Sequence, residues 1–123
     1  MKTDRISENE ISDILGDGLP EINSELEKIA GAHHIGKTML CFARYTLKCM
    51  ETGNLNMLNA CFNIAETLLS KGNQAVKTAV ENVYVFSVSS VLEMASPWQT
   101  QIKYIIPTTL KNTFQKVKLS HQS

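Results

Sequence analysis

Two Gly-Asn dipeptides, Gly53-Asn54 and Gly72-Asn73, constrain the fold of this chain more than any other feature of its sequence. Glycine supplies the left-handed backbone conformation that ends many helices, and asparagine caps the helix that comes next. Each dipeptide therefore predicts the end of one helix and the start of the next, with almost no loop between them. Connections this short make neighbouring helices run antiparallel.

Apolar side chains recur at helical spacing on both sides of the first dipeptide, which predicts helices over residues 35–52 and 55–70. The apolar face of the first helix comprises Ile35, Met39, Phe42, Ala43, Thr46 and Met50, widened by Leu40, Leu47 and Cys49. The stripe of the second comprises Leu58, Cys61, Phe62, Ala65, Leu68 and Leu69. The width of the first face predicts that its helix is central to the core.

Helix signals are also present at both ends of the chain. Ser7 and Glu10 have the spacing of a capping box, and Pro20 suits the first turn of a second helix. Toward the C-terminus, Pro97 breaks the chain. Residues 98–117 then predict one or two helices, with Pro107 as a kink or a boundary.

Residues 83–88 fit two secondary structures. Their β-branched and aromatic side chains are typical of a strand, whereas Val76, Ala79, Val80, Val83 and Ser87 are helically spaced. We expect a helix that continues to about Met94, because an isolated strand would have no partner strand elsewhere in the chain.

These signals predict an all-α fold of five to seven helices, stacked as antiparallel hairpins in a bundle that resembles helical repeats. At 123 residues we expect a single domain, 1–123, because one hydrophobic core is normal at this size. It comprises acidic N-terminal helices over 7–30, central helices over 35–94 and C-terminal helices over 98–118.

The formal net charge is zero, but the charges are segregated along the chain. Residues 1–27 hold eight acidic and two basic side chains, and residues 28–123 hold four acidic and ten basic ones. This pattern indicates either an interaction with another molecule or an attraction between the two halves. We expect no direct binding of nucleic acid, because the arginines are only Arg5 and Arg44.

Several function classes are disfavoured by what the sequence lacks. We find no motif of an enzyme or of phosphate binding, and we expect neither catalytic residues nor a cofactor. The adjacent His33 and His34 point apart, and the three cysteines lack metal-ligand spacing, so we expect no metal site. No signal peptide or membrane span is evident, which predicts a cytoplasmic protein without a membrane partner. We also expect no small-molecule ligand.

Arg44 lies among apolar residues in the middle of the helix predicted over 35–52. An arginine in such a position often pairs with an acid on another helix, or extends its charged group to the surface. We expect an ion pair with Glu66 or Glu81.

Four short motifs carry a resemblance to a known type of protein. They are F-A-R-Y (42–45), G-N-L (53–55), C-F-x-x-A-x-x-L-L-x-x-G-N (61–73) and A-V-x-x-x-Y (79–84). The chain resembles a family of small bacterial all-helical proteins, of a type found among the immunity proteins of polymorphic toxin and contact-dependent growth inhibition systems. The motifs cover roughly a third of the chain well, and they consist mostly of apolar and capping residues.

The resemblance implies that the chain neutralises a cognate toxin domain, commonly a basic nuclease, by direct binding. An acidic surface would then imitate a phosphate backbone and speed association. The candidate toxin-binding residues are Asp4, Glu8, Asp13, Asp17, Glu21 and Glu25. The alternative function is a helical adaptor or regulatory module that has no toxin partner.

Overall fold

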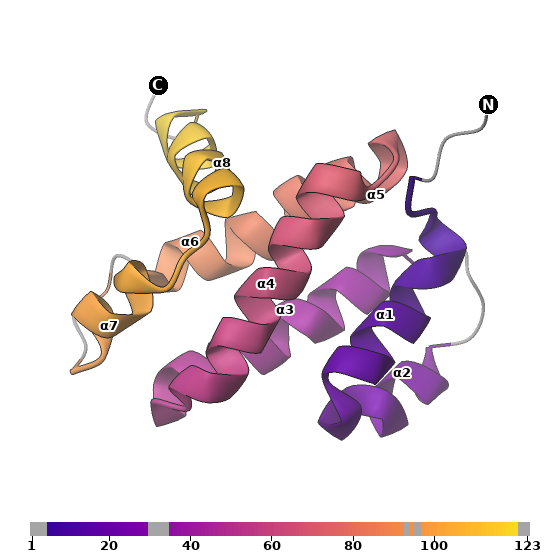
Figure 1. Ribbon diagram of the computed structural model, residues 1–123, viewed down its shortest axis with the longest axis horizontal. Coiled ribbons are helices and arrows are strands. Elements are labelled where there is room, and N and C mark those ends of the chain that lie inside the picture. The colour runs from indigo at the N-terminus through magenta and orange to yellow at the C-terminus, as the bar shows by residue number, and fades with distance from the viewer. Residues whose placement is uncertain (1–4, 30–34, 93, 95–96, 121–123) are drawn as a thin grey trace.

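The computed structural model describes residues 5–29, 35–92, 94 and 97–120, with side chains to Val117 (Figure 1). The elements in chain order are the 3-10 turn η1 (Glu8–Glu10), α1 (Ile11–Gly18), the 3-10 turn η2 (Pro20–Ile22), α2 (Asn23–Lys28), α3 (Ile35–Thr52), α4 (Leu55–Lys71), α5 (Gln74–Ala79), the π-helical segment η3 (Val80–Val85), α6 (Phe86–Leu92), α7 (Gln99–Tyr104) and α8 (Thr108–Ser120). The all-α class is confirmed. Since α5, η3 and α6 follow one another without a break, this part of the chain forms seven helices, within the expected number.

Both Gly-Asn dipeptides connect helices as predicted, but of the two glycines Gly53 alone is left-handed, and Gly72 is extended with φ of −72°. Gly53 has φ of 72°, the left-handed conformation, and the chain turns back there from α3 into α4 (Figure 1). The Asn54 side chain accepts the Met57 backbone N–H at 3.3 Å, and the Asn73 side chain accepts that of Val76 at 2.9 Å. The two asparagines therefore cap α4 and α5 and fix where these helices begin.

The core is built around α3, which packs against α1, α2, α4, η3 and α6. Every residue of the apolar stripe predicted for α4 is buried, and so is most of the face predicted for α3. Leu40 is an exception, because 37% of its surface is exposed. At the centre, the rings of Phe42 and Tyr84 stack with centroids 4.2 Å apart.

The expected helix over residues 83–88 is confirmed, but its inward face differs from the prediction. We expected Val83 and Ser87 to follow Val80 on the apolar face, whereas Tyr84 and Val88 are the fully buried residues. The π-helical turn of η3 causes the difference, since it places one extra residue in the turn and rotates the residues after it. Residues 83–88 therefore form a distorted helix despite their strand-like composition.

The N-terminal segment is anchored at the junction of α4 and α5, a contact that the sequence did not predict. The Ile6 N–H donates to the Lys71 carbonyl at 2.8 Å, and the Asn73 N–H donates to the Ile6 carbonyl at 2.8 Å. The Arg5 guanidinium adds a bond to the Gly72 carbonyl at 3.3 Å. These bonds hold the start of η1 against a point far along the chain.

Residues 98–117 form two helices, with Pro107 at their boundary, and α8 receives its cap from another element. The Glu66 carboxylate of α4 accepts the backbone N–H groups of Leu110 at 2.8 Å and Thr109 at 3.3 Å. A negative charge at a helix N-terminus satisfies free donors and favours the helix dipole. Glu66 therefore stabilises the docking of α8 on α4.

The ion pair expected for Arg44 is wrong. One candidate partner, Glu66, caps α8, and the other, Glu81, pairs with Lys116 at 3.2 Å. The Arg44 residue is exposed on α3. Arg44 therefore extends its charged group to the surface, which is the alternative to an ion pair for an arginine among apolar residues.

Candidate functional site

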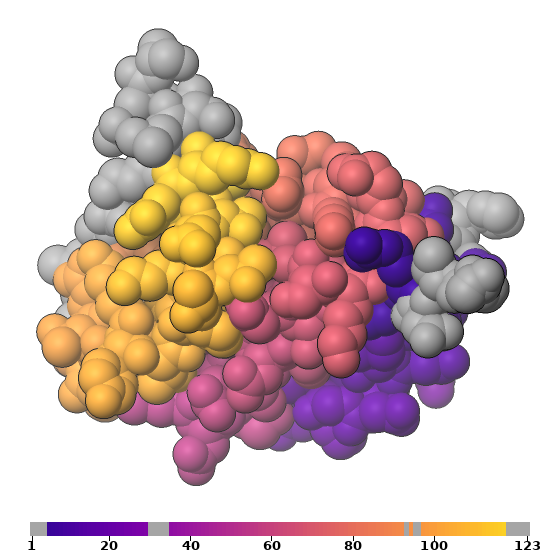
Figure 2. Space-filling model, turned by 45° about the horizontal axis from the view of Figure 1, so that its top comes forward, coloured from indigo at the N-terminus to yellow at the C-terminus, as the bar shows by residue number. Residues whose placement is uncertain are grey.

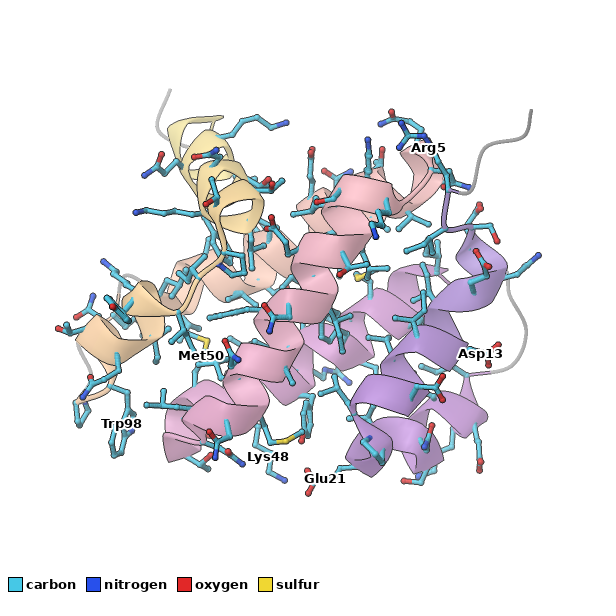
Figure 3. All side chains as sticks on the ribbon, in the orientation of Figure 1. Arg5, Asp13, Glu21, Lys48, Met50 and Trp98 are labelled. Carbon is cyan, nitrogen blue, oxygen red and sulfur yellow. The ribbon has the colours of Figure 1, made fainter. Side chains whose placement is uncertain are left out.

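The first helix presents a carboxylate pair on the side opposite to the core. Ile11 and Leu15 of α1 are buried, while Asp13 and Asp17 are exposed. The two aspartates are four residues apart and therefore lie on one side of the helix, one turn from each other. Within the described ranges, neither carboxylate has a hydrogen bond or an ion pair. Figure 3 shows Asp13 pointing from α1 away from α4.

Glu21 and Glu25 are also exposed, but each bonds a side chain of α3. The Tyr45 hydroxyl donates to Glu21 Oε1 at 2.6 Å, and the Cys41 thiol donates to Glu25 Oε1 at 3.4 Å. Burial, followed by the bond to Glu21, raises the pKa of Tyr45 above its ordinary value. These two glutamates therefore tie η2 and α2 to α3 while they add negative charge to the surface.

Glu8 belongs to the anchor of the N-terminal segment. Its Oε1 accepts the Asn73 amide at 3.3 Å. Its own backbone hydrogen bond, and after that the bond from Asn73, lower the pKa of its carboxyl. Glu8 is only partly exposed and has a structural role. Asp4, the remaining candidate, lies outside the described residues.

The structure thus brings four of the six predicted residues to one end of the molecule. We call the exposed carboxylates of α1, η2 and α2 the acidic end: Asp13, Asp17, Glu21 and Glu25. These three elements pack against one another, which places the four carboxylates on one region of the surface. Two of the carboxylates support the fold, and Asp13 and Asp17 stay available to a partner.

The basic side chains of α7 and α8 lie at the opposite end of the molecule. Lys103, Lys111 and Lys116 are exposed there, and Figures 1 and 2 show α4 between these helices and α1. Among the described side chains, the ion pair found is that of Lys116 with Glu81, which belongs to neighbouring η3. The described residues therefore show no ion pair that joins the acidic segment 1–27 to the basic remainder of the chain. The charge segregation of the sequence persists only in part in space, because Lys28, Arg44 and Lys48 are exposed on α2 and α3 beside the acidic end.

The three cysteines are buried and free. Burial, and then Glu25, raises the pKa of Cys41 to about 11, and burial raises the pKa of Cys61 to about 12. Burial also raises the pKa of Cys49. Because the thiolate is the reactive form, these side chains are suited to packing and poorly suited to nucleophilic attack.

Neither a metal centre nor a membrane-spanning helix is found among the described residues. His33 and His34 lie outside them, and the part of the chain that is described holds no group of three or more potential metal ligands. None of the helices in the same part combines the length and apolar character needed to cross a membrane.

Fold and surface together define a class: a helical bundle with an exposed acidic pair on its first helix and exposed lysines on its last two helices. Residues 12–122 match the family described as a domain of unknown function, DUF7674, and the chain belongs to this family. The match runs from the first turn of α1 through α8. Comparisons with curated proteins and with solved structures gave no match.

Proposed function

We propose that this chain is a protein-binding module that recognises a basic partner with its acidic end. Its narrower role would be that of a cytoplasmic immunity protein, which neutralises a toxin domain by direct binding. The observation that carries the proposal is the exposed pair Asp13 and Asp17, which has no partner within the described part of the chain. The resemblance of the 42–84 motifs to immunity proteins supports the narrower role.

The geometry suits electrostatic recognition. Asp13 and Asp17 stand one helical turn apart on a helix fixed by buried Ile11 and Leu15, so binding does not have to order them. Glu21 and Glu25 are held in place by their bonds to α3. Fixed charges of one sign attract an oppositely charged protein, raise its association rate and orient it before contact.

The proposal is tested with the C-terminal domain of the protein encoded immediately upstream. Binding is measured by calorimetry and stopped flow, and neutralisation is measured by the growth of cells that express the domain with and without this chain. We expect nanomolar binding and restored growth. If the chain binds no such domain and does not restore growth, the toxin role is refuted and a search for other partners of an adaptor comes next.

Two matched variants test the acidic end. D13N/D17N removes two negative charges there, and N112K/Q115K adds two positive charges on exposed positions of α8, so both raise the net charge by two. We expect D13N/D17N to slow association at low salt about tenfold, whereas N112K/Q115K changes it little. Equal effects of the two variants would show that net charge matters and that the acidic end does not.

A further inference from the structure

A cavity of about 360 Å³ lies where the end of α3 meets the end of α6 and α7. Its lining includes the buried side chains of Met50, Leu92 and Ile102, and the half-buried Leu47 and Val91. Figure 3 shows Met50 and Trp98 on the side of the molecule toward α7, away from α1 and α2. The cavity is therefore separate from the acidic end.

Two methionines contribute to the lining from different parts of the chain. Met50 comes from α3, and Met94 follows α6 with 62% of its surface exposed. An exposed methionine beside an apolar cavity leaves apolar surface in contact with water that a ligand would cover. Methionine side chains also adapt their shape to what they contact, which suits a binding surface.

Two polar side chains line the cavity, Gln99 and Glu51. Gln99 donates one Nε2 hydrogen to the Leu92 carbonyl at 3.2 Å, which leaves its Oε1 as an acceptor and its second Nε2 hydrogen as a donor. Glu51 also lines the cavity, and its carboxylate has no hydrogen bond or ion pair with any described residue. Among the lining residues Glu51 carries the charge, and its carboxylate calls for a donor that carries positive charge, to which Gln99 Oε1 can add a second acceptor.

The volume of the cavity limits the size of the apolar part of a ligand. A cavity of about 150 Å³ in another protein holds benzene, so 360 Å³ has room for about 14 non-hydrogen atoms at the same density. It also falls within the range of small-molecule sites, roughly 300 to 1,000 Å³. A flexible chain of ten or so carbons with a small head group meets both conditions.

We propose that this cavity binds a small amphiphile with an apolar body and a primary ammonium head, which Glu51 and Gln99 receive. We expected no small-molecule ligand from the sequence, and the cavity is the observation that changes this expectation. The site does not depend on the proposed function, because it shares no residue with the acidic end.

Three probes with one tail and different heads test the proposal: decylamine, decanol and decanoate. Binding to the full chain is followed by NMR of the methionine methyl groups. Met50 and Met94 report on the cavity, while Met39 and Met57 lie elsewhere and serve as internal controls. We expect decylamine to shift the Met50 and Met94 signals and to bind at least about tenfold more tightly than decanoate.

Two variants distinguish recognition of the ammonium head from binding of the apolar tail. E51Q should abolish the preference for decylamine over decanol, and E27Q, which removes an exposed charge on α2, should leave it unchanged. L47W should weaken the binding of all three probes, because its larger ring takes up part of the cavity. E51Q alters an exposed side chain, so it remains a valid test if L47W fails to fold.

Three results would overturn the site. The first is the absence of any shift at Met50 and Met94 up to millimolar decylamine. The second is an equal shift at Met39 and Met57, which would mean general disruption by an amphiphile. The third is equal affinity for decylamine and decanol in the unaltered chain, which would exclude recognition of the ammonium head.

Discussion

Tyr84 joins the packing of the core to a fully enclosed pair of hydrogen bonds. Its ring stacks on Phe42, and its hydroxyl lies 3.0 Å from Thr46 Oγ1. The Thr46 hydroxyl donates to the Phe42 carbonyl at 3.0 Å, so Tyr84 is the donor in the bond to Thr46. A buried phenol is tolerated here because it finds this acceptor.

Substitution at Tyr84 separates the hydrogen bond from the ring. Tyr84→Phe keeps the ring and leaves Thr46 bonded to Phe42, so we expect a loss of about 1 kcal/mol in the free energy of unfolding. Tyr84→Ala also removes the stacked ring and leaves a cavity, so we expect a loss of about 3 to 5 kcal/mol. Chemical denaturation of both variants measures this. Equal losses would mean that the ring contributes nothing beyond its hydroxyl.

The buried thiols allow a second prediction at the same scale. With pKa values raised from 9.0 to about 11 and about 12, Cys41 and Cys61 hold far less thiolate at neutral pH than a free cysteine. The deficit is about a hundredfold for Cys41 and about a thousandfold for Cys61. Iodoacetamide at pH 7.5 should therefore label the folded chain very slowly, as followed by mass spectrometry.

The same chain in guanidinium chloride is the control, and all three cysteines should be labelled there at the rate of free thiols. Native Cys61 that reacts as fast as in the unfolded chain would contradict the buried geometry.

At the scale of elements, Gly36 near the start of α3 and Gly53 just after its end differ in whether they tolerate a larger side chain. A Cβ on Gly53 would overlap the Trp98 ring, and φ of 72° is unfavourable for alanine. Gly36, near the start of α3, has nothing among the described atoms within 4 Å of such a Cβ. We expect Gly53→Ala to lower the free energy of unfolding by more than about 1 kcal/mol, and Gly36→Ala to raise it by about 0.5 kcal/mol.

Thermal denaturation of the two variants measures both changes, and each serves as the control for the other. A Gly53→Ala variant as stable as the unaltered chain would show that Trp98 does not pack as described.

Elements with local signals were predictable, and those that depend on distant contacts were not. The bounds of α3 agree with the prediction because Gly53 and Asn54 are read from the sequence alone. The inward position of Tyr84 was missed because periodicity assumes a regular helix, and the π-helical turn of η3 breaks that period. The role of Glu66 was missed because its partners, Thr109 and Leu110, are brought to it only by folding.

At the scale of the whole molecule, the sequence showed that the charges are segregated along the chain, but not where they would lie. A bundle of this length allows the two charged segments to pack together or apart. The structure separates them, because α1 packs on α3 and α4 while α8 packs on α4, α6 and η3. The candidate site was therefore predictable as a set of acids. That Glu8, Glu21 and Glu25 also bond other elements was not.

The whole molecule should be sensitive to alkali, because its raised pKa values act in the same direction. Burial raises the pKa of Cys41 to about 11 and of Cys61 to about 12, and it raises that of Tyr84 well above its ordinary value of 10.0. As pH rises above about 9, the unfolded chain releases these protons first, and ionisation then favours unfolding. The stabilisation is complete below the ordinary thiol pKa and is lost as pH approaches 12.

We therefore expect the free energy of unfolding to stay constant from pH 7 to about 8 and to fall steadily above about 9, as measured by guanidinium denaturation at each pH. Tyr84→Phe removes one of the groups that ionise, so its stability should fall less steeply above pH 10 than that of the unaltered chain. A constant stability to pH 11 would contradict the burial of the thiols. Parallel curves for the two chains would contradict the burial of the Tyr84 hydroxyl, because only a buried phenol resists ionisation that the unfolded chain allows.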